Sequence, residues 1–241
     1  TIHILINLMK KDFIFSEVNN LKGVGPQLSK YLKKKKIEKI KDIILNIPYS
    51  ETDRSKVVKL NNLEVGKIQS IKVQVKKLNF PRIRNLPNKI ICKDDTGEVD
   101  IVYFNSREGY LRKIYPINKW IIISGKINFF NKKYQITNPD YVTPIENQEF
   151  VLRNMPKYNL TKGINEKKYR SISEKVLNNL PKVDDWLDKN FIEKNNLIDW
   201  FESIQNLHKS KDAKNYQSKS FRRLVFDELC ANFTHYQKID V

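Results

Sequence analysis

The densest group of aromatic and cationic side chains follows an apolar run that ends near residue 104. Phe104 and Tyr110 flank a short polar stretch there. Three cations share the segment: Arg107, Arg112 and Lys113. An exposed ring can stack on a nucleobase, which is worth about 1–3 kcal/mol per base, and the cations can take phosphates. The spacing of the two rings also suits a protein core and, taken alone, favours that second interpretation.

A second basic segment lies between two apolar runs, at residues 79–85. It contains Arg82 and Arg84 on either side of Ile83, next to Pro81. Such a loop can contact phosphates, or it can simply keep a surface soluble. We treat Arg82 and Arg84 as candidate DNA contacts.

The segment Leu21–Pro26 (LKGVGP) resembles the turn of helix-hairpin-helix modules, in which backbone N–H groups at a helix N-terminus hold a phosphate. Lys22, Gly23 and Gly25 are therefore candidate phosphate contacts. A packing turn explains the two glycines equally well. The lysine run at residues 33–36 is interpreted as a solvated helix end, with attraction for phosphates as a by-product.

No pattern predicts catalysis. A P-loop ends in Gly-Lys-Ser/Thr, because backbone amides and the lysine cradle phosphates. Of the seven glycines, only Gly66 and Gly125 precede a lysine, and isoleucine follows in both cases. Asp94 and Asp95 could form a metal pair, but the Thr-Gly that follows favours a turn between strands. We expect no catalytic residue, no metal and no cofactor in these 241 residues.

The charge indicates a polyanionic partner. Lys and Arg number 45 against 27 Asp and Glu, and residues 1–145 hold 28 of these cations against 13 of the acids. Such a surplus attracts nucleic acid, although solubility in a lysine-rich composition is an alternative. Cys92 and Cys230 lie far apart and form no zinc or disulfide pattern. This cysteine usage fits a reducing cytosol, so we expect a cytoplasmic protein. No apolar run is long enough to span a membrane.

The period of the apolar residues divides the chain. Helical spacing recurs over residues 13–47, where Pro26 suits the first turn of a helix. About five strands follow within residues 57–145, with a short helix at 106–114 between the third and fourth. This order predicts a five-stranded OB-type barrel, a fold that binds oligonucleotides; an SH3-like barrel is the structural rival.

The last part is expected to hold a linker at residues 146–163 and then helices, the last of them capped by Ser218. Six apolar residues share one face of that helix: Phe221, Leu224, Val225, Leu229, Phe233 and Tyr236. We therefore expect an α+β chain in three parts. A helical segment with the hairpin-like turn occupies 1–56, the barrel 57–145, and the linker with its helices 146–241.

Four stretches resemble RecG helicases and come in that family's order. They are Leu21–Pro26 with Ile47–Tyr49 and Asp53–Ser55, then Tyr103–Asn105 with Tyr110–Leu111, then Pro156–Gly163 (PKYNLTKG), and last Phe221–Leu229. The resemblance implies the wedge region of an ATP-dependent DNA helicase that acts in recombination and repair. In that family a barrel sits at a branched junction, a replication fork or Holliday junction, and aromatic residues of a wedge loop stack on bases where the duplex splits.

Carried over by position, Phe104 and Tyr110 become the stacking residues, which reverses the core interpretation of Phe104. The resemblance also implies that the chain is a fragment. ATP and Mg would bind in motor domains that these residues lack, so the chain alone should not hydrolyse ATP. Its expected partners are branched DNA and those motor domains; a monomer with no membrane partner is expected.

Two other functions stay open. A stand-alone OB-fold module for single-stranded DNA or tRNA would have the same charge and strand pattern. A structural interaction domain whose charge is incidental would have them as well.

Overall fold

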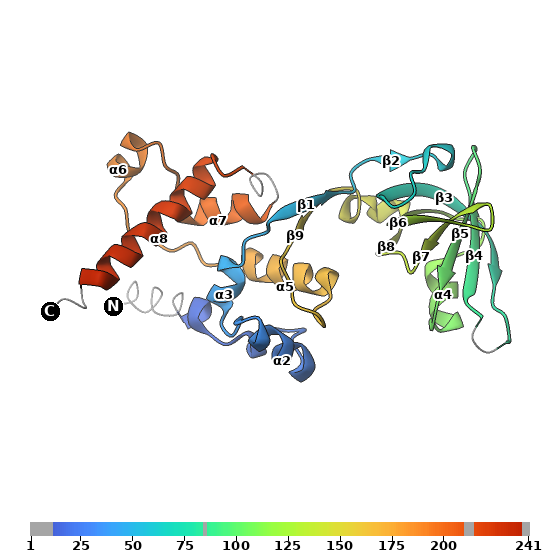
Figure 1. Cartoon of the computed structure of the whole chain (residues 1–241), viewed down its shortest axis with the longest axis horizontal. Helices are drawn as coiled ribbons and strands as arrows, with labels where there is room; N and C mark the ends of the chain where they lie inside the picture. Colours follow the sequence, from blue (N-terminus) through green and yellow to red (C-terminus); the bar gives the residue numbers. More distant parts are fainter. Residues whose placement is uncertain (1–11, 84–85, 210–214, 238–241) are drawn as a thin grey trace. The chain divides into compact units, whose positions relative to one another are not determined.

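A computed structural model describes residues 12–83, 86–209 and 215–237 of the chain (Figure 1). Helices and strands are mixed, which confirms the expected α+β class. The chain divides into two compact units, one formed by Thr52–Met155 and one by Thr1–Glu51 together with Pro156–Val241. One unit thus combines segments from before and after the other unit. The sequence led us to expect three consecutive parts, which do not include this combination.

The unit Thr52–Met155 is built on a closed barrel. Strand β3 pairs with β4, β4 with β5, β5 with β7, β7 with β6, and β6 again with β3, so five strands form a ring. All these pairings are antiparallel except the one between β5 and β7. This arrangement confirms the predicted OB-type barrel. The strands are β3 (Ile68–Asn79), β4 (Asn88–Lys93), β5 (Glu98–Tyr103), β6 (Trp120–Phe130) and β7 (Lys133–Thr137).

Alternating side chains build the interior of the barrel. In β3, Ile71 and Val73 are buried and Lys72 between them is exposed, because successive side chains of a strand point to opposite faces. All five strands contribute to the same apolar cluster. Gly125 in β6 allows a close approach there, since a Cβ at this position would lie 2.7 Å from Ile136 Cγ2.

Helix α4 (Glu108–Ile114) lies at one end of the barrel in Figure 1. Its Leu111, and Tyr115 directly after it, are buried in the same cluster as the strands. This helix confirms the short helix predicted between the third and fourth strands. By packing into the barrel, it gives the segment after β5 a fixed position.

Short elements flank the ring. Strand β2 (Val57–Val58) pairs parallel with β3, and β8 (Tyr141–Pro144) antiparallel with β6. Arg54 precedes β2 and is buried; its guanidinium donates to Ser124 Oγ at 2.8 Å and to the Asp140 carboxylate at 2.6 Å. Arg54 belongs to one of the stretches that resemble RecG helicases, and its side chain links the segment before β2 to β6 and to Asp140. The 3₁₀ helices here are η2 (Leu60–Asn62) and η3 (Ile145–Phe150).

The linker expected at residues 146–163 contains regular structure. Helix η3 starts within one residue of it, and β9 (Asn154–Lys157) pairs with β1 (Ser50–Asp53) in a two-stranded sheet. The segment expected to be a linker thus includes a 3₁₀ helix and a strand. Strands β1 and β9 are about a hundred residues apart in the sequence, so no local pattern could predict that they pair.

The other unit is helical. Its core joins α2 (Pro26–Lys34), α3 (Ile40–Leu45), α5 (Glu166–Asn178) and α7 (Trp200–His208). Pro26 occupies the first turn of α2, as predicted. Gly163 has a φ of 101°, and a Cβ there would lie 2.6 Å from the Tyr31 ring, so only glycine fits where this loop packs on α2. The 3₁₀ helix η1 (Val18–Asn20) precedes α2.

A buried arginine holds the last helix, α8 (Lys219–Gln237). Arg223 donates to both oxygens of Asp185 at 2.6 and 2.7 Å, to the Ile198 carbonyl at 2.9 Å and to Asp227 at 3.0 Å. Ser218 Oγ accepts from the Phe221 N–H at 3.1 Å, which confirms the predicted cap. Of the predicted apolar face, Val225, Leu229 and Phe233 are exposed, and the Tyr236 side chain lies outside the described residues. The short helix α6 (Lys189–Lys194) completes the unit.

Across the ranges that the structure describes, no helix is both long enough and apolar enough to cross a membrane.

Candidate nucleic-acid interface

Two tyrosines anchor the segment that carries the candidate aromatic residues. Tyr103 ends β5 and Tyr115 follows α4; both are buried, and their hydroxyl groups hydrogen-bond at 2.9 Å. Burial raises the pKa of Tyr103 to about 12 and the pKa of Tyr115 well above its ordinary value, so both hydroxyls keep their protons. Residues 104–114 are therefore held at both ends by the barrel core.

Hydrogen bonds from two neighbouring strands fix the turn between β5 and α4. Asn105 has a φ of 59°, a left-handed conformation that asparagine tolerates. Asn88, at the start of β4, donates its side-chain N–H to the Ser106 carbonyl at 2.8 Å. Asn138, just after β7, accepts from the Phe104 N–H at 3.4 Å. The backbone at Phe104 is thus positioned by elements on both sides of it.

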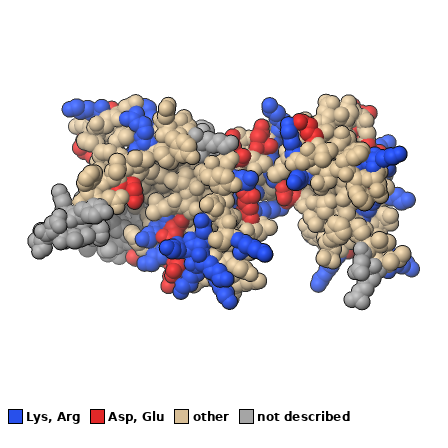
Figure 2. Space-filling model, viewed as in Figure 1, with Lys and Arg blue, Asp and Glu red and all other residues tan. Residues whose placement is uncertain are grey.

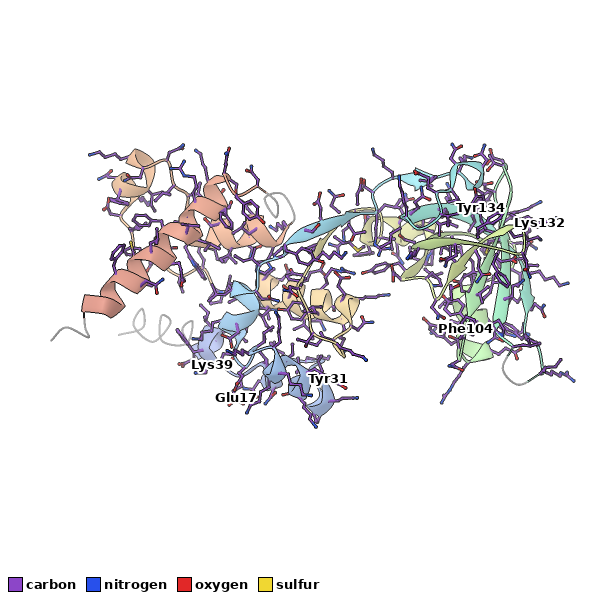
Figure 3. All side chains as sticks on the ribbon, viewed as in Figure 1. Glu17, Tyr31, Lys39, Phe104, Lys132 and Tyr134 are labelled. Carbon is purple, nitrogen blue, oxygen red and sulfur yellow. The ribbon has the colours of Figure 1, made fainter. Side chains whose placement is uncertain are left out.

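Phe104 and Tyr110 project from this segment into solvent. The exposed fraction is 51% for Phe104 and 58% for Tyr110. Tyr110 lies in the first turn of α4, next to the buried Leu111. The core interpretation that spacing alone favours is therefore wrong for both rings. Figure 3 shows Phe104 at the end of the barrel near α4. Stacking on a base stays a prediction.

The nearby cations differ in how they are held. Arg112 donates from Nε and Nη2 to the Glu108 carboxylate at 2.9 and 2.7 Å and lies 4.9 Å over the Phe80 ring. Because an exposed ion pair contributes at most about 1 kcal/mol, Arg112 can exchange Glu108 for a phosphate at small cost. Arg107 and Lys113 are exposed, and neither forms an ion pair with another described residue.

The remaining candidates fall in two places. Arg82 is exposed on the loop between β3 and β4, whereas Arg84 lies outside the described residues. The glycine turn belongs to the helical unit: Gly23 has a φ of 104°, Gly25 precedes α2 as its N-cap, and Lys22 is exposed. This backbone suits a helix-hairpin-helix turn, and phosphate contact there stays a prediction.

The structure adds a groove that sequence reasoning missed. It measures about 580 Å³ and runs over the outer face of β4, β5 and β7. Phe104 lines it, and so does Phe130, whose ring is 64% exposed at the hairpin between β6 and β7. Two cations in the groove are already paired, Lys89 with Asp100 at 3.0 Å and Lys133 with Glu98 at 3.6 Å. The groove therefore offers aromatic ends and a mixed polar floor.

The strand register gives the length of this groove. Strands β5 and β7 are parallel, with Val99 opposite Tyr134 near the hairpin, so Phe104, directly after β5, lies five residues beyond this position. Five residues at about 3.3 Å each span roughly 17 Å. Lys132 at the hairpin and Phe104 lie at opposite ends of the barrel in Figure 3. At about 3.4 Å per stacked nucleotide, the groove has room for up to about five nucleotides of one strand.

One signal could have pointed to Phe130. The residues Asn131-Lys132-Lys133 are typical of a turn, and Asn131 and Lys132 indeed have φ values of 49° and 62°. Phe130 directly precedes this turn, so the turn signal places it at the tip of a hairpin. Asp100, which faces the groove, carries no comparable signal, because its burial depends on a partner from β4.

The remaining reactive groups have structural roles. Asp94 accepts from the N–H groups of Leu60, Thr96 and Gly97, as a turn predicts; although burial opposes it, these bonds hold the pKa of Asp94 below its ordinary value. Burial raises the pKa of Cys92 to about 12, so its thiol is inert. Within the described ranges, no three His, Cys, Asp or Glu side chains gather as a metal site would require.

A closed five-stranded barrel with a short helix between its third and fourth strands is an OB-type fold. The family described as the RecG wedge domain matches residues 17–181. The chain belongs to this RecG wedge domain family.

Similar proteins point the same way. The ATP-dependent DNA helicase RecG of Thermotoga maritima is 29% identical over 228 residues, which cover 93% of this chain and 29% of that protein. The RecG of Staphylococcus aureus strain MSSA476 is 26% identical over 233 residues, covering 93% and 32%. A solved structure of RecG bound to a three-way DNA junction has a TM-score of 0.76 at 27% identity, covering 94% and 31%. The chain thus spans about a third of the length of these relatives.

Proposed function

We propose that this chain is the junction-binding wedge of a RecG-type ATP-dependent DNA helicase and that it holds branched DNA where two strands separate. One observation carries the proposal. Phe104 and Tyr110 are exposed on a segment that Tyr103 and Tyr115 hold at both ends. A ring whose backbone is already fixed loses little conformational entropy when a base stacks on it. The relative solved with a three-way DNA junction supports the same partner.

The energetics favour an existing branch over an intact duplex. Two stacked bases would contribute about 2–6 kcal/mol, at about 1–3 kcal/mol each. Opening a duplex costs about 1.4 kcal/mol for each base-pair step in stacking alone. The two rings can therefore stabilise a branch point that already exists, whereas continued opening needs work from elsewhere. Arg107, Arg112 and Lys113 would position the phosphates next to the stacked bases.

The activity of the whole protein is part of this proposal. The relatives are ATP-dependent helicases, and this chain matches only about a third of their length. We assign ATP and Mg to the rest of such a protein, since none of the seven glycines here forms a P-loop. The wedge would then determine which DNA structure is engaged, and the motor would supply the work.

A second candidate function rests on the groove. Phe104 and Phe130 both line it, and aromatic residues at either end of a strand-lined groove are typical of OB modules that bind a single strand. A single-stranded DNA or tRNA binder would use the groove without needing Tyr110. The two candidates share Phe104 and differ in the DNA structure that they prefer.

Fluorescence anisotropy with four probes of equal length separates them: a three-way junction, a linear duplex, a single strand and a tRNA. The junction proposal predicts the tightest binding to the three-way junction at moderate salt. Equal affinity for all four probes would contradict it. A preference for the single strand or the tRNA would favour the stand-alone module, and binding without any salt dependence would indicate that the charge is incidental.

A further inference from the structure

The most concentrated charge in the chain lies outside the barrel. Residues 22–41 hold eight lysines and a single acid, Glu38. Figure 2 shows these cationic side chains gathered over α2, in the lower middle of the view. We call the exposed ones the lysine ridge. It consists of Lys22, Lys30, Lys33, Lys34, Lys36 and Lys39.

The fold turns this ridge toward solvent. Leu32 in α2 and Ile40 in α3 are buried in the helical core, and Ile37 in the turn between the two helices is buried as well. Because the apolar face of each helix is occupied by the core, the lysines are left on the opposite face. Lys36 has a φ of 60°, so the chain turns at this lysine between α2 and α3. Both helices belong to the same unit.

Glu17, Glu38 and Asp42 are the acids that lie nearest to the ridge in the sequence. Glu17 and Glu38 are exposed, and Glu17 forms a β-bridge with Lys39. The Asp42 carboxylate accepts from the N–H groups of Glu38 and Lys39 at 2.9 and 2.8 Å, so it serves as the cap of α3. Among the described residues, no ion pair involves any of the six ridge lysines. The charge is therefore available to a partner.

We propose that the lysine ridge is a second nucleic-acid surface, which binds the phosphate backbone of a DNA duplex without regard to sequence. Tyr31, the one ring in α2, packs against Gly163, so the helix offers no ring on which bases of a single strand could stack. An anionic membrane would need an exposed apolar face as well, and the core takes that face. Nine residues make α2 about 13 Å long, the length of about four base-pair steps.

This surface is separate from the junction contact of the proposed function, and an unbranched probe tests it alone. The experiment measures affinity for a linear duplex of about 25 base pairs over a series of salt concentrations. The ridge variant carries Lys30→Gln, Lys33→Gln, Lys34→Gln and Lys36→Gln. The control variant carries the same charge change at four exposed lysines elsewhere in the helical unit: Lys189→Gln, Lys194→Gln, Lys209→Gln and Lys219→Gln.

The ridge variant should lose at least tenfold in affinity, and the slope of log K against log salt should fall by about 3–4, because each neutralised phosphate contributes about 0.9. The control variant should change the slope by less than about 1. Equal losses in the two variants would mean that only net charge matters and would overturn the proposal. Ridge-dependent binding to phosphatidylserine vesicles, with duplex binding unchanged, would overturn it in favour of a membrane. Circular dichroism of both variants verifies that they fold.

Discussion

The hydroxyl groups of Tyr103 and Tyr115 meet at 2.9 Å inside the barrel, and the eleven residues between them include Phe104 and Tyr110. Their rings pack edge to face with centroids 5.9 Å apart. The bond therefore closes the segment that carries both candidate stacking residues. It also gives each buried hydroxyl its partner, which is the condition for burying a polar group at low cost.

The pair should behave as a unit in unfolding experiments. Tyr103→Phe leaves the Tyr115 hydroxyl buried without its partner, so it should lower the free energy of unfolding by about 1–3 kcal/mol. The double variant Tyr103→Phe with Tyr115→Phe removes both groups and should recover most of that loss. Urea denaturation of the two single variants and the double variant measures the coupling. Additive losses would mean that the hydroxyls do not support one another.

Arg223 should contribute far more to the free energy of unfolding than its neighbour Arg222. Truncating Arg223 to alanine leaves the Asp185 carboxylate without its cation, and breaking a buried pair in this way costs about 3–5 kcal/mol. Arg222 is exposed, so Arg222→Ala should cost less than about 0.5 kcal/mol. Thermal and urea denaturation compare the two. Similar small losses for both would show that Arg223 is not the clamp of α8.

Two glycine substitutions should change stability in opposite directions. Gly163→Ala would place a Cβ 2.6 Å from the Tyr31 ring at a φ of 101°, so a loss of at least about 1–3 kcal/mol is expected. Gly109 lies in α4, and an alanine Cβ there would meet nothing within 4 Å, so Gly109→Ala should gain up to about 1 kcal/mol of helix propensity. Urea denaturation measures both changes. A stabilised Gly163→Ala variant would contradict the packing of this loop on α2.

His208 should make the stability of the helical unit depend on pH. Its Nε2 donates to the Ile44 carbonyl at 2.8 Å, and its Nδ1 lies 3.0 Å from the Tyr158 hydroxyl. Burial lowers its pKa from 6.5 to about 4, although the bond to Ile44 acts in the opposite direction. Between pH 6.5 and about 4 the imidazole of His208 is therefore protonated in the unfolded chain and neutral in the folded chain. The contribution of His208 is complete above pH 6.5 and is lost as the pH falls toward 4, by up to about 3 kcal/mol.

Comparison with His208→Gln isolates this contribution, since other groups titrate alike in both proteins. The unfolding free energy of wild type minus that of the variant should decrease as the pH falls from about 7 to about 4. A difference that stays constant over this range would mean that His208 is already charged in the fold or is not buried.

Local patterns predicted the elements whose signals are local. The alternation around Ile71 and Val73, the turn at Asp94 and the Ser218 cap each depend on neighbours within a few residues, and the structure has all three. The barrel followed from the order of the strands. Base stacking by Phe104 and Tyr110 came from family resemblance, and it remains a prediction although both rings are exposed.

Long-range contacts account for what the sequence could not reveal. The pairing of β1 with β9 joins segments about a hundred residues apart. Arg54 and Arg223 look like surface cations in the sequence, yet both are buried. Each forms an ion pair with an aspartate distant in the chain, Asp140 and Asp185 respectively. The groove between Phe104 and Phe130 exists only once β5 and β7 are adjacent.

The preference for a three-way junction over a linear duplex shows directly whether Phe104 holds the branch point. It is measured as the ratio of the two dissociation constants in wild type, Phe104→Ala and Phe150→Ala; Phe150 is an exposed ring of the same unit and serves as the control. Loss of one stacked base should weaken junction binding by roughly fivefold or more in Phe104→Ala, with duplex binding unchanged. Phe150→Ala should keep the wild-type ratio. A folded Phe104→Ala variant with an unchanged junction preference would mean that Phe104 does not stack at the branch point.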